Sequence, residues 1–227
     1  MTRNRRRRKH RGVALPLVCL VAASLAQAQA PAVTEDGEFE FARHLLRDGM
    51  HDLASQQFQL YITNHPNSPR TADAFLLLAE SYIARGVFAR AADTYQGFII
   101  KEPQDVRVRE FWLKEAELRA RAGQHAEASR AYLELADAYP ESDFADDALL
   151  GAAMSLVRNG ESDRAERTLS GLIERYPRST VLPRARVLLG QVLLERGDAA
   201  GAQEAIRAVV LERAMNDDVA DALLLGA

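Results

Sequence analysis

The sequence has almost no cysteine and none of the short motifs that mark common catalytic sites. Its single cysteine, Cys19, lies in an apolar stretch of 13 residues, 13–25, whereas a membrane-spanning helix needs ~20. The patterns HExxH, CxxC, GxSxG and the phosphate-binding loop are all missing. These absences exclude a disulfide-rich secreted fold. We therefore predict no catalytic, cofactor-binding or metal site, and expect a protein that is not an enzyme.

The first 28 residues have the layout of a secretory signal peptide. A basic run, MTRNRRRRKHRG, precedes the short apolar stretch, and Ala26-Gln27-Ala28 supplies a small-x-small cleavage site. This pattern predicts cleavage after Ala28 and export to the periplasm, and disfavours a nucleic-acid or nuclear role for the arginines. Lipidation of Cys19 would need a small residue before it, and Val18 is not one. Anchoring in the envelope through an uncleaved or lipidated N-terminus is the alternative.

Removal of the signal changes the charge of the chain. The full sequence has 29 basic and 32 acidic residues, and seven basic but no acidic residues lie in 1–28. The remaining chain therefore has 22 basic and 32 acidic residues, a net charge of −10. Such an acidic chain is a poor partner for nucleic acid or for an anionic membrane surface, so we expect membrane association only through partners.

A repeat of 37 residues organises the rest of the sequence. Four series of residues keep this spacing in phase, which makes the repeat the strongest signal in the chain. They are Gly49, Gly86, Gly123, Gly160 and Gly197; Ala54, Ala91, Ala128, Ala165 and Ala202; Pro66, Pro103, Pro140 and Pro177; and Ala42, Ala79, Ala116, Ala153, Gly190 and Ala227.

Each series has a local physical cause. The glycines follow helical patterns and can take the left-handed conformation of a helix end. The prolines cannot continue a helix. Two residues beyond each proline position stands a residue type suited to a helix N-cap, which predicts N-caps at Ser68, Asp105, Ser142, Ser179 and Asn216. Each unit thus reads as helix A, glycine turn, helix B and proline stop; in the second unit these helices cover about 70–85 and 88–101.

These patterns resemble the tetratricopeptide repeat family. In the second unit Phe75, Leu78, Ala79 and Tyr82 match its helix-A pattern; Ala91, Tyr95, Phe98 and Pro103 match its helix-B pattern, and Trp112 and Tyr132 continue them. Glu115, Arg119 and Arg186 depart from it. The resemblance implies an all-α, right-handed superhelical solenoid of helix-turn-helix units. The prolines and the segments after them are similar to a bacterial envelope branch, which includes the outer-membrane β-barrel assembly lipoprotein and the periplasmic partner of the Tol-Pal system.

The expected organisation is a signal peptide over 1–28, a polar lead-in over 29–37, and a repeat array over 38–227. The array has five units and the first helix of a sixth, which begins at Asn216. Because Leu223, Leu224 and Leu225 leave that last helix little polar surface, we expect the chain to be a fragment of a longer array or to dock onto another copy. We expect His44, His51, His65 and His125 to be surface residues.

The resemblance places a partner-binding groove on the helix-A surface. An apolar floor with acidic residues in the second and third units favours a peptide or helix segment that is basic and amphipathic. Any one of the apolar residues could instead pack inside the repeats. The predicted groove residues are Asp73, Leu76, Glu80, Ile83, Glu110, Leu113, Glu117, Leu150, Met154, Val157, Val187, Gln191 and Leu194.

The function that these observations favour is an exported, non-enzymatic scaffold that binds other proteins in the cell envelope. By analogy with the envelope branch, its pathway would be outer-membrane assembly or Tol-Pal-linked maintenance. Two alternatives are an accessory region of a longer enzyme and a structural array that self-associates.

Overall fold

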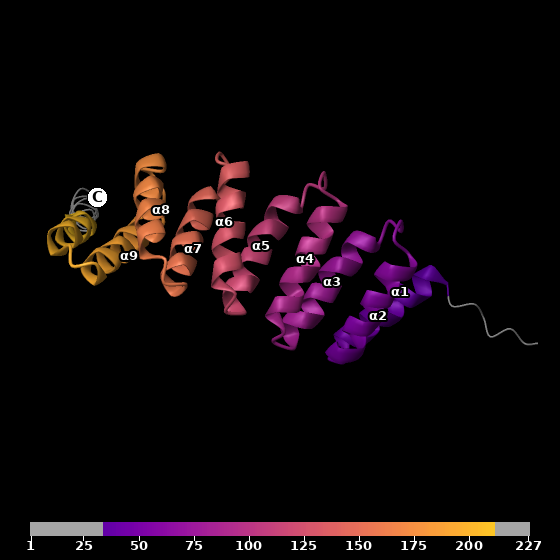
Figure 1. Ribbon diagram of the computed structural model, residues 1–227. Coiled ribbons are helices and arrows are strands. Elements are labelled where there is room, and N and C mark those ends of the chain that lie inside the picture. The colour runs from indigo at the N-terminus through magenta and orange to yellow at the C-terminus, as the bar shows by residue number, and fades with distance from the viewer. Residues whose placement is uncertain (1–33, 212–227) are drawn as a thin grey trace, which may run out of the picture. The chain divides into compact units, whose positions relative to one another are not determined.

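A computed structural model describes residues 34–211, and within that range the secondary structure is entirely helical (Figure 1). Nine helices are followed by a further helical segment over 199–211. Their bounds are α1 Glu35–Arg47, α2 His51–Asn64, α3 Thr71–Ala84, α4 Phe88–Lys101, α5 Val108–Arg121, α6 His125–Ala138, α7 Ala145–Arg158, α8 Ser162–Arg175 and α9 Leu182–Glu195. No helix in residues 34–211 is both long and apolar enough to cross a membrane.

The odd-numbered helices are the predicted A helices, and the even-numbered ones are the B helices. The bounds of α4 coincide with the predicted 88–101, and α3 differs from 70–85 by one residue at each end. The helix α1 begins at Glu35, inside the predicted lead-in, because the Thr34 side chain caps it by accepting from the Gly37 N–H at 3.1 Å. The signal peptide and the predicted sixth A helix lie outside the described residues.

The glycine turns have the predicted left-handed conformation. The φ angles of Gly49, Gly86, Gly123, Gly160 and Gly197 lie between 71° and 85°. At Gly86 the turn is closed by two hydrogen bonds: the Gly86 N–H donates to the Ile83 carbonyl, and the Val87 N–H donates to the Tyr82 carbonyl, both at 2.9 Å. This pairing satisfies carbonyl groups that the end of α3 would otherwise leave free.

The predicted N-caps are displaced from the helix ends. The A helices begin three residues after Ser68, Asp105, Ser142 and Ser179, and the residues directly before those helices make no side-chain cap. The predicted residues instead cap a short turn that precedes each helix: the Asp105 side chain accepts from the Arg107 N–H at 2.8 Å, and the Asp105 carbonyl accepts from the Val108 N–H at 3.1 Å. Ser142 differs, because its hydroxyl donates to the Tyr139 carbonyl.

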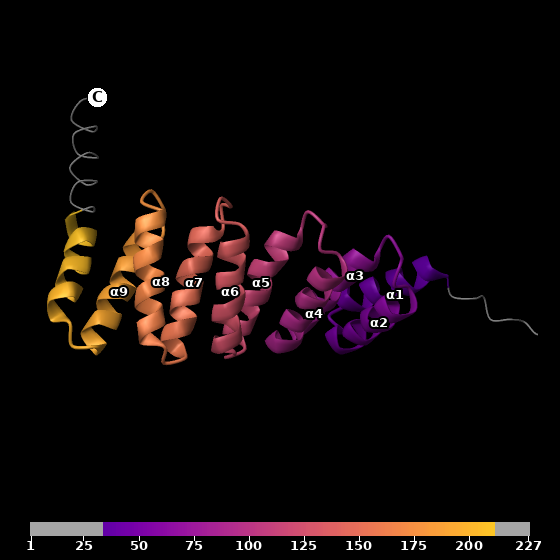
Figure 2. The same ribbon diagram turned by 45° about the horizontal axis from the view of Figure 1, so that its top comes forward.

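Small residues let the helices approach closely. Ala42, Ala79, Ala116 and Ala153 are fully buried in the A helices, as are Ala54, Ala91, Ala128 and Ala165 in the B helices. A methyl group added at Gly190 would lie 3.1 Å from the Ile206 side chain, so glycine lets α9 and the segment 199–211 approach here without a shift of that side chain. The helices follow one another side by side along the chain, each packed on the next (Figure 2). Direct contacts also join α1 to α3, α5 to α7 and α7 to α9.

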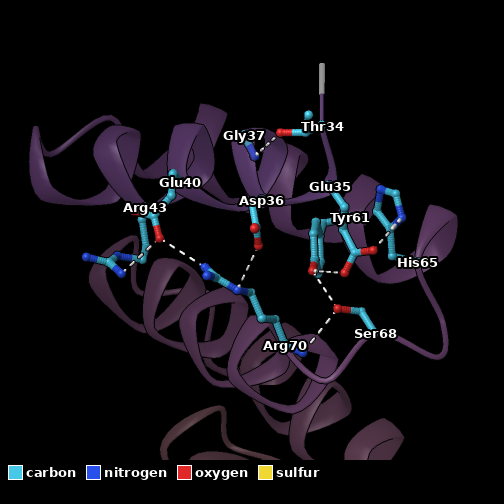
Figure 3. A network of polar contacts seen from close by, with 10 residues as sticks. All are labelled: Thr34, Glu35, Asp36, Gly37, Glu40, Arg43, Tyr61, His65, Ser68 and Arg70. Atoms are coloured by element: carbon cyan, nitrogen blue, oxygen red, sulfur yellow. Dashed lines mark hydrogen bonds and ion pairs between the residues drawn. The ribbon is translucent and has the colours of Figure 1, made fainter. Parts of the chain in front are cut away.

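A polar network fixes the first unit to the loop that leads into the second (Figure 3). The Tyr61 hydroxyl donates to Glu35 at 3.1 Å and lies 2.7 Å from the Ser68 hydroxyl. Arg70 forms ion pairs with Asp36 at 3.2 Å and with Glu40 at 3.0 Å. Hydrogen bonds from Ser68 and Tyr61 hold the pKa of the Glu35 carboxyl below its usual value. Groups from α1, α2 and the following loop are thereby joined.

Candidate partner-binding face

The thirteen predicted groove residues lie on α3, α5, α7 and α9, and we call the sides of these helices that carry them the A-helix face. They recur at three- and four-residue spacing, so helical geometry keeps them on one side of each helix. Eight are exposed: Asp73, Glu80, Glu110, Glu117, Met154, Val187, Gln191 and Leu194. Leu76, Ile83, Leu113 and Val157 are half-buried, and Leu150 is buried.

The apolar residues of this face divide into two groups. Leu76 and Ile83 pack against the core between the second and third units, and Leu113 and Val157 pack against the core of the later units. Their exposed remainder can still touch a ligand, but their main contacts are inside the array. Met154, Val187 and Leu194 are different, because 37%, 39% and 59% of their surface is exposed.

The structure brings four of the predicted residues together around one apolar hollow of about 360 Å³. Leu150 and Met154 come from α7, and Val187 and Gln191 come from α9. The helix-A pattern did not predict the other lining residues, which are Pro183, Arg184, Leu188 and Val209. Val209 belongs to a B helix, and no helix-A pattern could have identified it. A hollow of this size, with a mainly apolar lining, can accommodate one or two side chains of a bound segment.

The acidic part of the face lies on α3 and α5. Asp73 pairs with Arg107 at 3.2 Å, and Glu110 pairs with Lys114 at 2.6 Å. Within residues 34–211, Glu80 and Glu117 form no ion pair, so their carboxylates are available to a basic ligand. Desolvation by neighbouring side chains raises the pKa of Glu117, although its side chain keeps an exposed surface.

The histidines are less exposed than expected. Among the four histidines of residues 34–211, His44 is exposed, and His51, His65 and His125 are half-buried. His65 lies 2.8 Å from Glu38, and His44 lies 2.8 Å from the Arg47 guanidinium. In residues 34–211 no three His, Cys, Asp or Glu side chains are grouped as metal ligands would be.

Two departures from the repeat pattern pair with one another. Glu115 and Arg119 occupy positions where Leu78 and Tyr82 stand in the second unit. Both are buried, and the Arg119 Nε donates to the Glu115 Oε1 at 2.6 Å. In the sequence each residue is a separate departure from the repeat pattern, and their spacing of four along a helix is the sign that they could pair.

Known proteins share this architecture. The MamA protein aligns with 15% identity and a TM-score of 0.60, over 82% of this chain and 95% of MamA. YrrB, a TPR protein with an unusual peptide-binding site, aligns with 13% identity and a TM-score of 0.55, over 78% of this chain and 85% of YrrB. BtubC from P. vanneervenii aligns with 14% identity and a TM-score of 0.56, over 80% of each chain.

Comparison with curated protein sequences gave no match. One tetratricopeptide repeat profile matches residues 39–106 and 150–223, and a second matches residues 110–142. These profile matches cover most of the sequence and agree with the helix pairs and the glycine turns. The chain therefore belongs to the tetratricopeptide repeat family, whose members generally serve as protein-interaction scaffolds.

Proposed function

We propose that this protein is a non-enzymatic scaffold that binds a segment of another protein along its A-helix face. The observation that carries the proposal is the apolar hollow between α7 and α9, on the same face as the carboxylates of Glu80 and Glu117. YrrB, which has the same fold, has a peptide-binding site, and this supports the same class of ligand here.

The ligand that fits this face is an amphipathic peptide or helix with basic residues. Its apolar side chains would enter the hollow beside Met154 and Val187, and its basic residues would lie toward α3 and α5. Burial of apolar side chains would supply most of the affinity, because exposed ion pairs contribute little. Charge complementarity would mainly speed association and set the orientation of the segment.

We further propose that the protein acts in the bacterial cell envelope after removal of residues 1–28. The basic run, the short apolar stretch and the site at Ala28 support export. Outer-membrane assembly and Tol-Pal-linked maintenance are the two pathways that the resemblance of the repeat junctions favours. N-terminal sequencing of the envelope fraction tests the export step: the expected first residue is Gln29, and a chain that begins at Met1 or carries lipid on Cys19 contradicts it.

The binding proposal is tested by replacing Met154 and Val187 with aspartate. Both side chains are exposed, so the fold should survive, and helicity can be checked by circular dichroism. The matched control is Leu53→Asp with Val106→Asp, since these apolar residues are 47% and 87% exposed and lie outside the hollow. Partners are captured by crosslinking and identified by mass spectrometry. The amount captured should fall at least about tenfold in the Met154→Asp, Val187→Asp variant and should not fall in the control. Equal capture by both variants contradicts the proposal.

A further inference from the structure

A second hollow, of about 570 Å³, lies between the B helices α4 and α6, with α5 as its floor. Its α5 residues are Trp112, Glu115 and Arg119. A rotation of 100° per residue places them roughly 160° around α5 from Glu110, Leu113 and Glu117. This hollow is therefore on the other side of α5 from the A-helix face, and the proposed scaffold function does not use it. It is lined by Asp93, Gln96, Ile99, Ile100, Trp112, Glu115, Arg119, Glu127, Arg130, Ala131 and Glu134.

The floor of the hollow carries a buried charge pair. The side chains of Glu115 and Arg119 are 4% and 9% exposed. Arg119 is well supplied with acceptors: besides Glu115, it donates to Gln96 at 3.1 Å and to Gln124 at 3.4 Å, and it pairs with Asp93 at 3.5 Å. Glu115 uses only its Oε1 atom in this network, and its Oε2 atom accepts no hydrogen bond from the described residues.

The charges around this pair are unbalanced. Asp93, Glu127 and Glu134 add three carboxylates, whereas Arg130 adds one guanidinium, so the lining has a surplus of two negative charges. Burial raises the pKa of Glu115 despite the opposing effect of Arg119, and the nearby carboxylates of Glu134 and Asp93 raise it further. A cation that entered the hollow would relieve this repulsion and compensate a desolvated carboxylate.

Part of the lining of the hollow is apolar. Ile99, Ile100 and Ala131 face it, together with the ring of Trp112, whose other contacts include Tyr139 at 6.0 Å between ring centroids. An alkyl chain can lie along such a wall while its charged end reaches the carboxylates. A guanidinium or ammonium group could also contact the indole ring.

We propose that this hollow binds a basic side chain, arginine or lysine, of a partner protein. The charged end would lie between Glu115 and the rim carboxylates of Glu127 and Glu134, and the alkyl stem would lie against Trp112 and Ile99. This site is separate from the A-helix face, so one molecule could hold two partner segments on its two sides.

The hollow one repeat earlier serves as an internal comparison for this site. An equivalent hollow lies one repeat earlier, between α2 and α4. It is lined by Ser55, Gln56, Gln59, Leu60, Tyr82, Arg85, Val87 and Arg90, which include two arginines and no carboxylate. Selective binding of a cation is therefore expected at the second hollow and not at the first.

The test uses Trp112, the only tryptophan of the chain, as the reporter. N-acetyl-arginine amide and N-acetyl-lysine amide are titrated against the protein lacking residues 1–28, and N-acetyl-glutamine amide serves as the neutral probe. A saturable change of the fluorescence is expected with the two basic probes at millimolar concentration. No saturable change with either, or an equal change with the neutral probe, overturns the proposal.

Two charge variants locate the binding. Glu127→Gln with Glu134→Gln should lower the affinity for the arginine probe at least fivefold. Asp137→Asn with Glu174→Gln removes the same charge from exposed residues outside the hollow and should leave the affinity within twofold. Equal weakening in both variants would show that net charge alone attracts the probe, and would also overturn the proposal.

Discussion

The second and third units have the same helix–turn–helix backbone, but the hollows on the B-helix side of their A helices differ in charge. Leu78 and Tyr82 in α3 correspond to Glu115 and Arg119 in α5, one period later. The hollow beside Tyr82 is lined by arginines, whereas the hollow beside Arg119 is rich in carboxylates. The glycine turns and the alanine contacts are unchanged between the two units. The 37-residue period thus determines the helix positions and leaves the charge of each surface free to vary.

The largest effect is expected when the buried pair of the third unit is broken. Glu115→Leu alone removes the carboxylate that Arg119 contacts at 2.6 Å and leaves only the more exposed Asp93 at 3.5 Å, and should lower the free energy of unfolding by up to about 3–5 kcal/mol. Adding Arg119→Tyr restores the residue types of the second unit, and the double variant should be as stable as the original protein or more stable by about 1–4 kcal/mol. Urea unfolding followed by circular dichroism measures both. A double variant less stable than Glu115→Leu alone would contradict this account of the pair.

The glycine turns test whether the two backbones are equivalent. Gly86 and Gly123 have φ angles of 71° and 78°, and no atom would obstruct an added methyl group at either. Alanine should therefore lower stability by a similar amount at both, about 1–2 kcal/mol, because only the left-handed conformation penalises it. Gly171→Ala is the control, since Gly171 is helical with open space around it, and this change should raise stability by up to about 1 kcal/mol. Unequal losses at Gly86 and Gly123 would show that the turns differ.

The loops that enter the two units should differ in their response to acid. Asp105 stands before the third unit where Ser68 stands before the second, and hydrogen bonds from Arg107 lower the Asp105 pKa to about 2 from 3.8. A lowered carboxyl pKa stabilises the fold above pH 3.8, and this contribution is lost as the pH falls toward 2. Asp105→Ser should reduce stability at neutral pH by under about 1 kcal/mol, because the loop is solvent-accessible. Between pH 5 and pH 2 the unfolding temperature of the variant should also fall less than that of the original protein. An equal fall in both would contradict the lowered pKa of Asp105.

The smallest effect concerns an ion pair that repeats with the period. Arg70 pairs with Asp36 and Arg107 pairs with Asp73, each at 3.2 Å, and both aspartates are largely exposed. Asp36→Asn and Asp73→Asn should each change the free energy of unfolding by less than about 0.5 kcal/mol. A loss above 1 kcal/mol in either would show that these pairs are part of a stronger network than their exposure indicates.

The sequence predicts the helices of this array well because each unit repeats the same local rules. Glycine, proline and alanine positions determine where helices end and where they touch, and the bounds of α4 follow from them. The N-caps were displaced because Ser68 and Asp105 close a turn before the helix, and the sequence pattern does not distinguish these two geometries.

The candidate sites were only partly predictable. Met154, Val187 and Gln191, which helical spacing selects, line one hollow, but Val209 joins them from the next helical segment, 199–211. The pairing of Glu115 with Arg119 also depends on burial, since α4 and α6 remove both side chains from water. Such features depend on neighbouring helices, and a pattern within one helix does not contain them.

The central claim, that partner segments bind on the A-helix face, is tested most directly by site-specific photo-crosslinking in living cells. Benzoylphenylalanine is placed at Val187 in one protein and at Arg167 in another; Arg167 is exposed on α8, and neither hollow includes it. The account predicts a crosslink from Val187 to a segment with apolar and basic residues, and none from Arg167. Crosslinks to the same segment from Arg167 alone, or equally from both positions, would contradict it.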